Sequence, residues 1–391
     1  MARTTIRTED ITDGSVANVD VNASAAIAQS KLSLDIVNAN VNASAAIVQS
    51  KLATLSIDTA ELADDAVTAA KIADGGYLAN RNRIVNGNFD VWQRGTSFAG
   101  QTATAYFADR WEVAPATGCT MTVSRQAFTA GQTDVPYEPS YFLRADITTA
   151  GSANAEITNR IEDVRTLAGQ TIAVSFYAKS VAGTQTLTCR IHQDFGSGGS
   201  TRVTSGTSAK VLSSSWQKFT FSLALGSISG KTIGTSSYTA FNFYWDNSST
   251  SNDVDLAQVQ VEAGSTYTPF EYKTFGQELA ACQRYYSKSY NTDVAPATSG
   301  AVGACSSLAI YSSGSQSLGA RWVTSMRTAP SVVIYPPGST NTGYVQQTSN
   351  NAEVAATAGD IGMGGFQYLS GSLPNGAADG VRFHWSADAE L

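Results

Sequence analysis

A repeat with a fixed spacing of 20 residues occupies the first 80 residues of this 391-residue chain. Residues 21–32 recur almost unchanged as residues 41–52, and a looser third copy runs from 65 to 72. A fixed period predicts an array of equivalent structural units. Each unit looks like a short helix, which is marginally stable by itself in water. It offers only a few Ile, Val, Leu and Ala side chains, too few for one chain to build a hydrophobic core. We therefore predict that parallel copies of the chain complete the units as a homo-oligomer. The alternative is a disordered leader.

From residue 83 onward the sequence has β character. Apolar residues alternate with polar or small ones, which is the pattern of half-buried antiparallel strands. Gly/Ser/Asn turns separate these runs, and many short strands with regular turns predict a β-sandwich or jelly roll. The clearest runs are Ile172, Val174 and Phe176; Leu187, Cys189 and Ile191; Phe219, Phe221, Leu223 and Leu225; and Phe241, Phe243 and Trp245.

A short helix and a second β region are expected after this sandwich. Leu279, Cys282 and Tyr286 fall on one face of a helix over 277–287. The last 100 residues return to short apolar runs between turns. The fold class is therefore predicted to be mainly β, in three parts. These are an attachment or shaft segment over 1–80, a β-sandwich over 81–274, and a smaller C-terminal β domain over 275–391 that begins with the connector helix.

Charge and composition exclude several classes of partner. The formal net charge is −7 and the 25 Lys and Arg residues are scattered singly, so we expect no nucleic-acid binding, which requires a concentrated positive field. No apolar run is long enough to cross a bilayer, so we expect no membrane insertion. The start of the sequence has no apolar stretch typical of a signal peptide, so we expect a protein made in a cytoplasm. The four widely spaced cysteines predict free, buried thiols.

The residues needed for common catalytic sites are sparse. The two histidines, His192 and His384, lie in different predicted domains, which disfavours a nucleophile–base pair and a catalytic zinc site. Glycoside hydrolysis needs two carboxylates flanking one bond, and the densest acidic group of the predicted sandwich is Glu156, Glu162 and Asp163. We expect a non-enzymatic protein without an organic cofactor.

Several stretches resemble structural proteins of tailed bacteriophages. The leader over 4–14 and the repeats look like the shaft or attachment segment of phage tail fibres. The block over 83–95, with the Ala-Asp-Arg-Trp at 108–111, looks like the start of a phage carbohydrate-binding-module-like jelly roll. The motifs at 262–264 and 268–271 are similar to its end, and residues 278–286 and 384–391 also resemble segments of such proteins. The resemblance implies a homotrimer whose N-terminus attaches to other tail or baseplate proteins of the virion.

The same resemblance implies candidate ligands for a metal ion. Such jelly rolls often hold a structural calcium ion, and the matching oxygen ligands here are Asn88, Asp90 and Asp255. The alternative is that Asn88 and Asp90 form a turn.

Sugar rings stack on exposed aromatic faces with polar neighbours. The aromatic candidates for glycan binding are Tyr244, Trp245, Trp322 and Trp385, with a place in the hydrophobic core as the alternative for each.

Together, these features predict a phage tail fibre that contacts a host-surface polysaccharide through its distal β domains. Two alternatives stay open. One is a structural virion component, such as a capsid fibre or baseplate spacer, that binds no glycan. The other is a polysaccharide-degrading spike.

Overall fold

The structure is a computed structural model that describes residues 80–308, 315–316, 319–371, 373 and 380–391. The 20-residue repeats lie outside the described residues, so a shaft built by several chains stays a prediction. All of the described residues belong to one of the two units into which the chain divides. Among them, no helix combines the length and apolar character that a membrane span requires.

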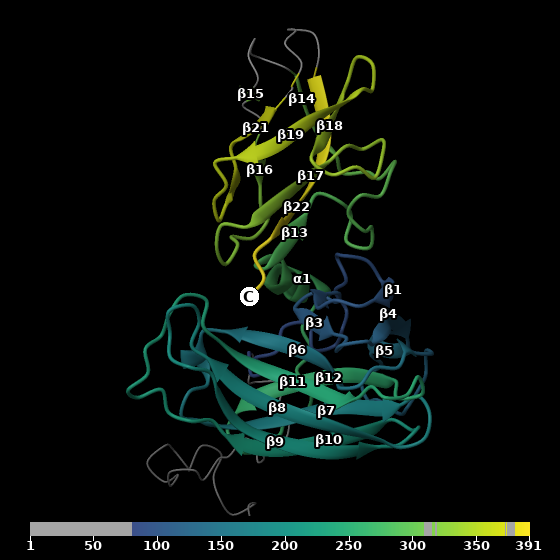
Figure 1. Ribbon diagram of the computed structural model, residues 1–391, viewed down its shortest axis with the longest axis vertical. Helices are drawn as coiled ribbons and strands as arrows, with labels where there is room; N and C mark the ends of the chain where they lie inside the picture. The colour runs from purple at the N-terminus through teal and green to yellow at the C-terminus, as the bar shows by residue number, and fades with distance from the viewer. Residues whose placement is uncertain (1–79, 309–314, 317–318, 372, 374–379) are drawn as a thin grey trace, which may run out of the picture. The chain divides into compact units, whose positions relative to one another are not determined.

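Two six-stranded antiparallel sheets form a β-sandwich (Figure 1). In spatial order, the first sheet consists of β1 (Ser97–Gln101), β4 (Thr120–Ala127), β5 (Tyr141–Thr149), β12 (Val254–Ala263), β7 (Thr171–Ser180) and β10 (Gln217–Ala224). The second sheet consists of β2 (Ala105–Tyr106), β3 (Trp111–Ala114), β6 (Asn154–Glu162), β11 (Tyr238–Asp246), β8 (Gln185–Asp194) and β9 (Val203–Leu212). A short 3-10 helix, η7 (Val164–Thr166), follows β6.

Aromatic rings from both sheets meet in one hydrophobic core. Phe176 of β7 packs edge-on against Phe243 of β11, with ring centroids 4.9 Å apart. Trp111 of β3 stacks near the same ring, and all three side chains are fully buried. Burying a Phe side chain stabilises a fold by about 1.5–3 kcal/mol. The alternation seen in the sequence therefore identified the side of β7 and of β11 that faces this core.

An irregularity in β12 turns one side chain out of the core. The register between β12 and β7 shifts between Ala257 and Gln260. Gln258 lies within the shift. Its φ of 48° is in the left-handed region, which residues other than Gly and Asn rarely adopt. Its amide reaches Pro136 and Tyr272 instead of the core. The bulge thus places a buried amide on the outer side of the first sheet.

After the sandwich, a helix leads into a second β structure (Figure 1). Helix α1 (Phe275–Gln283) begins at a capping box made by Thr274 and Gln277. It ends four residues before the predicted end, because Tyr286 to Lys288 form a strand that pairs with the last strand of the chain. The strands are β13 (Tyr286–Lys288), β14 (Cys305–Leu308), β15 (Ser315–Gln316), β16 (Ala320–Arg321), β17 (Ser331–Tyr335), β18 (Tyr344–Gln347), β19 (Glu353–Gly359), β20 (Gly365–Phe366), β21 (Tyr368–Gly371) and β22 (Gly380–Asp388).

The sandwich and the C-terminal strands have separate hydrophobic cores. Polar contacts connect the two regions within a single unit. The Glu162 carboxylate accepts hydrogen bonds from Nε and Nη2 of Arg284, at 3.0 and 2.9 Å, and from the Tyr285 hydroxyl at 2.9 Å. Arg110, itself fully buried, pairs with Glu390. The predicted boundary at residues 274 and 275 coincides with the cap of α1, and a division into two independent domains stays a prediction.

Candidate functional site

Three of the four aromatic candidates for sugar stacking lie in the hydrophobic cores. Trp245 is 1% exposed, and its indole Nε1 donates to the Asn252 carbonyl oxygen at 2.7 Å. Trp322 and Trp385 are 7% and 5% exposed and pack together with centroids 4.6 Å apart. Burial leaves none of these three rings with an exposed face on which a sugar could stack. All three are core residues, which was the alternative interpretation of each. Tyr244 is half-buried and faces outward from β11, so its role stays a prediction.

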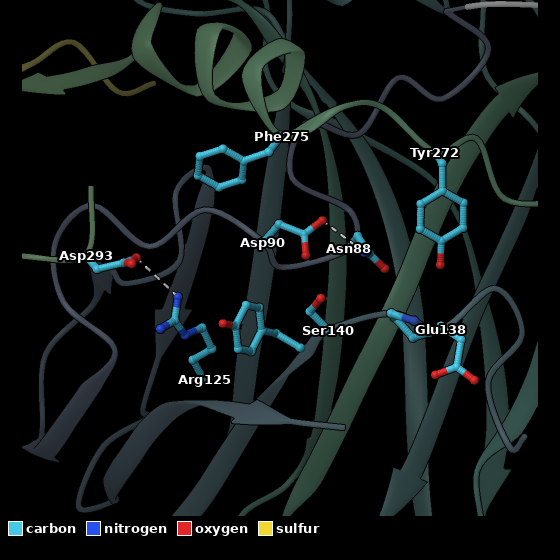
Figure 2. A pocket seen from close by; sticks show the side chains of 10 residues that line it. Asn88, Asp90, Arg125, Glu138, Ser140, Tyr272, Phe275 and Asp293 are labelled. Atoms are coloured by element: carbon cyan, nitrogen blue, oxygen red, sulfur yellow. Dashed lines mark hydrogen bonds and ion pairs between the residues drawn. The ribbon is translucent and has the colours of Figure 1, made fainter. Parts of the chain in front are cut away.

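The residues implied for calcium do not form a shared set of oxygen ligands. Asn88 and Asp90 line a cavity of about 380 Å³, and the Asn88 amide Nδ2 donates to the Asp90 carboxylate at 2.9 Å (Figure 2). Burial raises the pKa of Asp90, against the lowering effect of that hydrogen bond. Both oxygens of Asp255 bind the Arg144 guanidinium, at 2.7 and 2.8 Å, and Lys179 lies 3.6 Å away.

Calcium requires six to eight oxygen ligands. Here Asn88 turns its N–H groups toward Asp90, and the charge of Asp255 is already balanced by two cations. No cluster of three His, Cys, Asp or Glu side chains suited to a metal occurs in the described part of the chain. The arrangement fits the alternative of a turn at Asn88 and Asp90 better than a calcium ion shared with Asp255.

A different cavity, of about 400 Å³, lies on the outer face of the second sheet. Strand pairing places its central residues in one row across four strands. Glu112 of β3 lies beside Thr158 of β6, Thr158 beside Asn242 of β11, and Asn242 beside Arg190 of β8. These positions alternate with core residues such as Phe243, so they must face away from the core. We call this cavity and its lining side chains the polar face.

Hydrogen bonds and ion pairs hold the side chains of the polar face in place. The Glu156 carboxylate accepts from Nη2 of Arg190 and from Nδ2 of Asn242, both at 2.9 Å. Nδ2 of Asn242 also donates to the Thr158 hydroxyl at 2.7 Å. Arg160 forms an ion pair with Glu112. Each carboxylate is therefore bound to a guanidinium and is poorly placed to act as a free acid or base.

Several polar atoms of this face have no hydrogen-bond partner within the described ranges. They include Oδ1 of Asn242, which is 1% exposed, and the Nε atoms of Arg160 and Arg190. Buried polar groups are normally paired, and an unpaired one is costly. The polar face thus offers one acceptor and two donors that a hydroxylated ligand can satisfy. Beside them, the Tyr244 ring lies 4.9 Å from the Arg190 guanidinium.

The charges around this cavity are unequal at neutral pH. Arg160, Arg190 and Arg202 carry three positive charges, against two on Glu112 and Glu156. Burial raises the pKa of Glu112 above its usual value, and the nearby Arg160 offsets this only in part. Burial, with the neighbouring Arg202 and Arg190, lowers the pKa of His192 to about 4, so this imidazole is neutral at pH 7.

Sequence reasoning named three residues of this region, Tyr244, Glu156 and His192, for different reasons. The other two members of the acidic group lie apart from the cavity: Glu162 binds Arg284, and Asp163 caps η7. Arg190 and Asn242 were not identified. The signal that could have found them is the same alternation that predicted the strands, because polar residues between core positions mark the exposed face of a sheet.

Comparisons with known proteins gave matches of structure only. No protein-family model matches the sequence, and no curated protein matches it. One similar solved structure, described as "CBM4 structure and function", has a TM-score of 0.29 at 15% identity, covering 46% of this chain and 99% of the other. The CBM22-1 xylan-binding domain from Paenibacillus barcinonensis has a TM-score of 0.28 at 14% identity, covering 44% and 99%.

A phage protein is also among the similar structures. The enzymatically active domain of tailspike protein 4 from bacteriophage CBA120 has a TM-score of 0.29 at 15% identity, over 47% of this chain and 21% of that one. The described part of this chain is thus similar to carbohydrate-binding modules and to part of a phage tailspike. With TM-scores below 0.3, these likenesses leave the ligand to be inferred from the side chains themselves.

Proposed function

We propose that this protein is a non-enzymatic, glycan-binding tail fibre of a bacteriophage, and that the polar face binds a polysaccharide of the host surface. The observation that carries the proposal is the set of fixed but unsatisfied polar atoms around Asn242 and Arg190. Sugar hydroxyls both donate and accept hydrogen bonds, so one sugar ring can satisfy groups of both kinds. The resemblance of the sequence to phage tail proteins supplies the biological setting.

Binding is favoured over catalysis by the state of the carboxylates. Hydrolysis requires one carboxyl that can donate a proton and one that is free to attack or to activate water. Glu156 accepts hydrogen bonds from Arg190 and Asn242, and Glu112 is paired with Arg160. Both carboxylates are therefore engaged by guanidinium groups rather than free to attack a sugar or to activate water. The polar face is therefore better suited to hold a sugar than to cleave it.

The trimer and virion-attachment part of the proposal rests on the amino-acid sequence. In it, the N-terminal repeats join three copies of the chain and anchor them to other virion proteins. Three copies of a weak site raise the overall avidity without any strong single site. Mass photometry of the full chain at micromolar concentration should give a trimer. A monomer would contradict this part of the proposal.

A glycan array of bacterial lipopolysaccharides and capsular polysaccharides tests the binding function. The full chain should bind a defined subset of the array, and Arg190→Ala should reduce that signal about tenfold, as expected for loss of a charged contact. Arg165→Ala is the matched control, because Arg165 is 59% exposed on η7 and does not line the polar face.

Two outcomes would contradict the proposal. If the wild-type chain binds no glycan, the structural virion component becomes the better interpretation. If incubation with a bound polysaccharide releases new reducing ends, the protein is a degrading spike.

A further inference from the structure

A second cavity, of about 310 Å³, lies on the outer side of the first sheet. Its floor is formed by β7, where Ser175 and Tyr177 face away from the core, and by the bulge of β12. Its walls come from the loop around Tyr137 and from the segment over 267–270, which runs back across the sheet after β12. We call this cavity the aromatic groove. It shares no lining residue with the polar face.

Aromatic side chains on the rim of this groove are unusually open to solvent. Tyr137 is 60% exposed and Tyr267 is 45% exposed. The Tyr137 ring packs edge-on against Tyr272 with centroids 5.8 Å apart, and Tyr272 packs against Phe270 at 5.1 Å. Tyr137 is thus held by ring contacts while part of its surface stays uncovered, and the exposed Tyr267 lines the same groove. Rings of this kind match the apolar C–H faces of a pyranose.

One buried polar atom on the floor of the groove points to a ligand with hydroxyl donors. Gln258 is 2% exposed, and its Nε2 donates to the Pro136 carbonyl oxygen at 2.7 Å and contacts the Tyr272 hydroxyl at 2.5 Å. Because the Pro136 carbonyl oxygen can only accept a hydrogen bond, the Gln258 amide cannot rotate to exchange the positions of Nε2 and Oε1. Its Oε1 has no donor anywhere in the described part of the chain. A donor from outside the protein is needed to satisfy it.

The charges around the groove select among possible ligands. Lys218 is the one charged side chain in its lining, whereas five charged side chains line the polar face. An anionic or cationic ligand would therefore find little charge complementarity here. A proline-rich peptide also packs on aromatic grooves, but proline has no N–H to offer Gln258 Oε1.

We propose that the aromatic groove is a second carbohydrate site, separate from the polar face, that binds a neutral saccharide. Tyr137 and Tyr267 supply the stacking surface, and Gln258 Oε1 accepts a hydrogen bond from a sugar hydroxyl. The protein would then bind glycans on both faces of one sandwich, through rings on one side and through charged groups on the other.

Affinity electrophoresis of the full chain through gels containing β-1,4-galactan, dextran or hydroxyethylcellulose tests this proposal. We expect retardation by at least one of these neutral polysaccharides, with little dependence on salt because no ion pair is involved. Tyr267→Ala should raise the apparent Kd about tenfold, the size of effect typical for an aromatic contact in a binding site. Gln258→Leu, with its fold checked by circular dichroism, should also weaken retardation.

Two control variants show whether the aromatic groove itself binds the neutral polysaccharide. Tyr344→Ala removes an aromatic ring of similar exposure, 40%, from the C-terminal β structure. Arg190→Ala disables the polar face. Both variants should bind the neutral polysaccharide with a Kd within about twofold of the wild-type value. Losing a typical contact would change the Kd by more than this.

Three results would overturn the proposal: no retardation in any of the three gels, an unchanged Kd in Tyr267→Ala, or binding of a polyproline peptide that competes with the polysaccharide. Loss of neutral binding in Arg190→Ala would also overturn it, because the polar face would then be the single site.

Discussion

His192 lies on β8 in the lining of the polar face, where its environment opposes a positive charge. The residue is 6% exposed, and Nη1 of Arg202 approaches its Nε2 at 3.4 Å. Burial lowers the pKa of His192 from 6.5 to about 4, with Arg202 and Arg190 adding to the effect and Asp194 opposing it. Between these two values the unfolded chain holds the proton and the folded chain does not, so acid favours unfolding.

The expected loss follows from the two pKa values. A group with a pKa of 6.5 in the unfolded chain and about 4 in the folded chain destabilises the fold by about 2 kcal/mol at pH 5. At pH 7 the same group contributes close to zero. This part of the stability is present above pH 6.5 and is lost as the pH falls toward 4.

Urea unfolding of the full chain at pH 7 and pH 5, with and without His192→Gln, measures this effect. Glutamine keeps a polar side chain of similar size but takes up no proton. We expect the wild type to lose about 2 kcal/mol more than the variant between the two pH values. His384, the one other histidine of the chain, is present in both proteins, so its titration cancels. Equal losses in the two proteins would refute the reasoning, as would a His192 ring proton that titrates near pH 6.5 by NMR.

Three further perturbations test the fold. Phe176→Ala should lower the free energy of unfolding of the sandwich by about 3–5 kcal/mol by urea titration, and an unchanged midpoint would contradict the inter-sheet core. Glu162→Gln should cost about 1–2 kcal/mol at pH 7 by the same assay. Burial alone raises the pKa of Glu162, but hydrogen bonds from Arg284 and Tyr285 outweigh it and leave the pKa below 4.5. This contribution to stability is therefore lost as the pH falls through the lowered pKa of Glu162. A difference in the free energy of unfolding between Glu162→Gln and the wild type that increased in acid would contradict this reasoning. Burial raises the pKa of the Cys189 thiol, so a thiol reagent should modify it only after unfolding, and rapid labelling of the native protein would contradict its burial.

The strand pattern is the part of this protein that the sequence predicted best. Ile172, Val174 and Phe176 all face the sandwich core, as their alternation indicated. The reason is local: successive side chains of a strand point to opposite faces, so the periodicity records which face is buried. The connector helix was also predicted, but its end was not. Tyr286 leaves the helix because it pairs with Asp388, a partner about 100 residues away in the sequence.

The aromatic candidates show where residue type alone was a poor guide. Trp245 was considered as a sugar platform, although it continues the run of Phe241 and Phe243 that predicts a core-facing side chain. Tyr244, between them, is the position that faces outward. Applying the alternation to the aromatic residues would have separated the two. For Trp322, which lies in no alternating run, the sequence offered no such signal.

By itself, the sequence determined the β class of the described residues and which side of many strands is apolar. The tertiary structure alone decided which polar side chains became neighbours. Glu112, Glu156, Arg190 and Asn242 come from four different strands and meet through the strand order of the second sheet. Strand order depends on how the whole chain buries its apolar surface, whereas the alternation within a strand depends only on the local backbone geometry. For the same reason Arg144, 111 positions away in sequence, neutralises Asp255, a contact that no local pattern encodes.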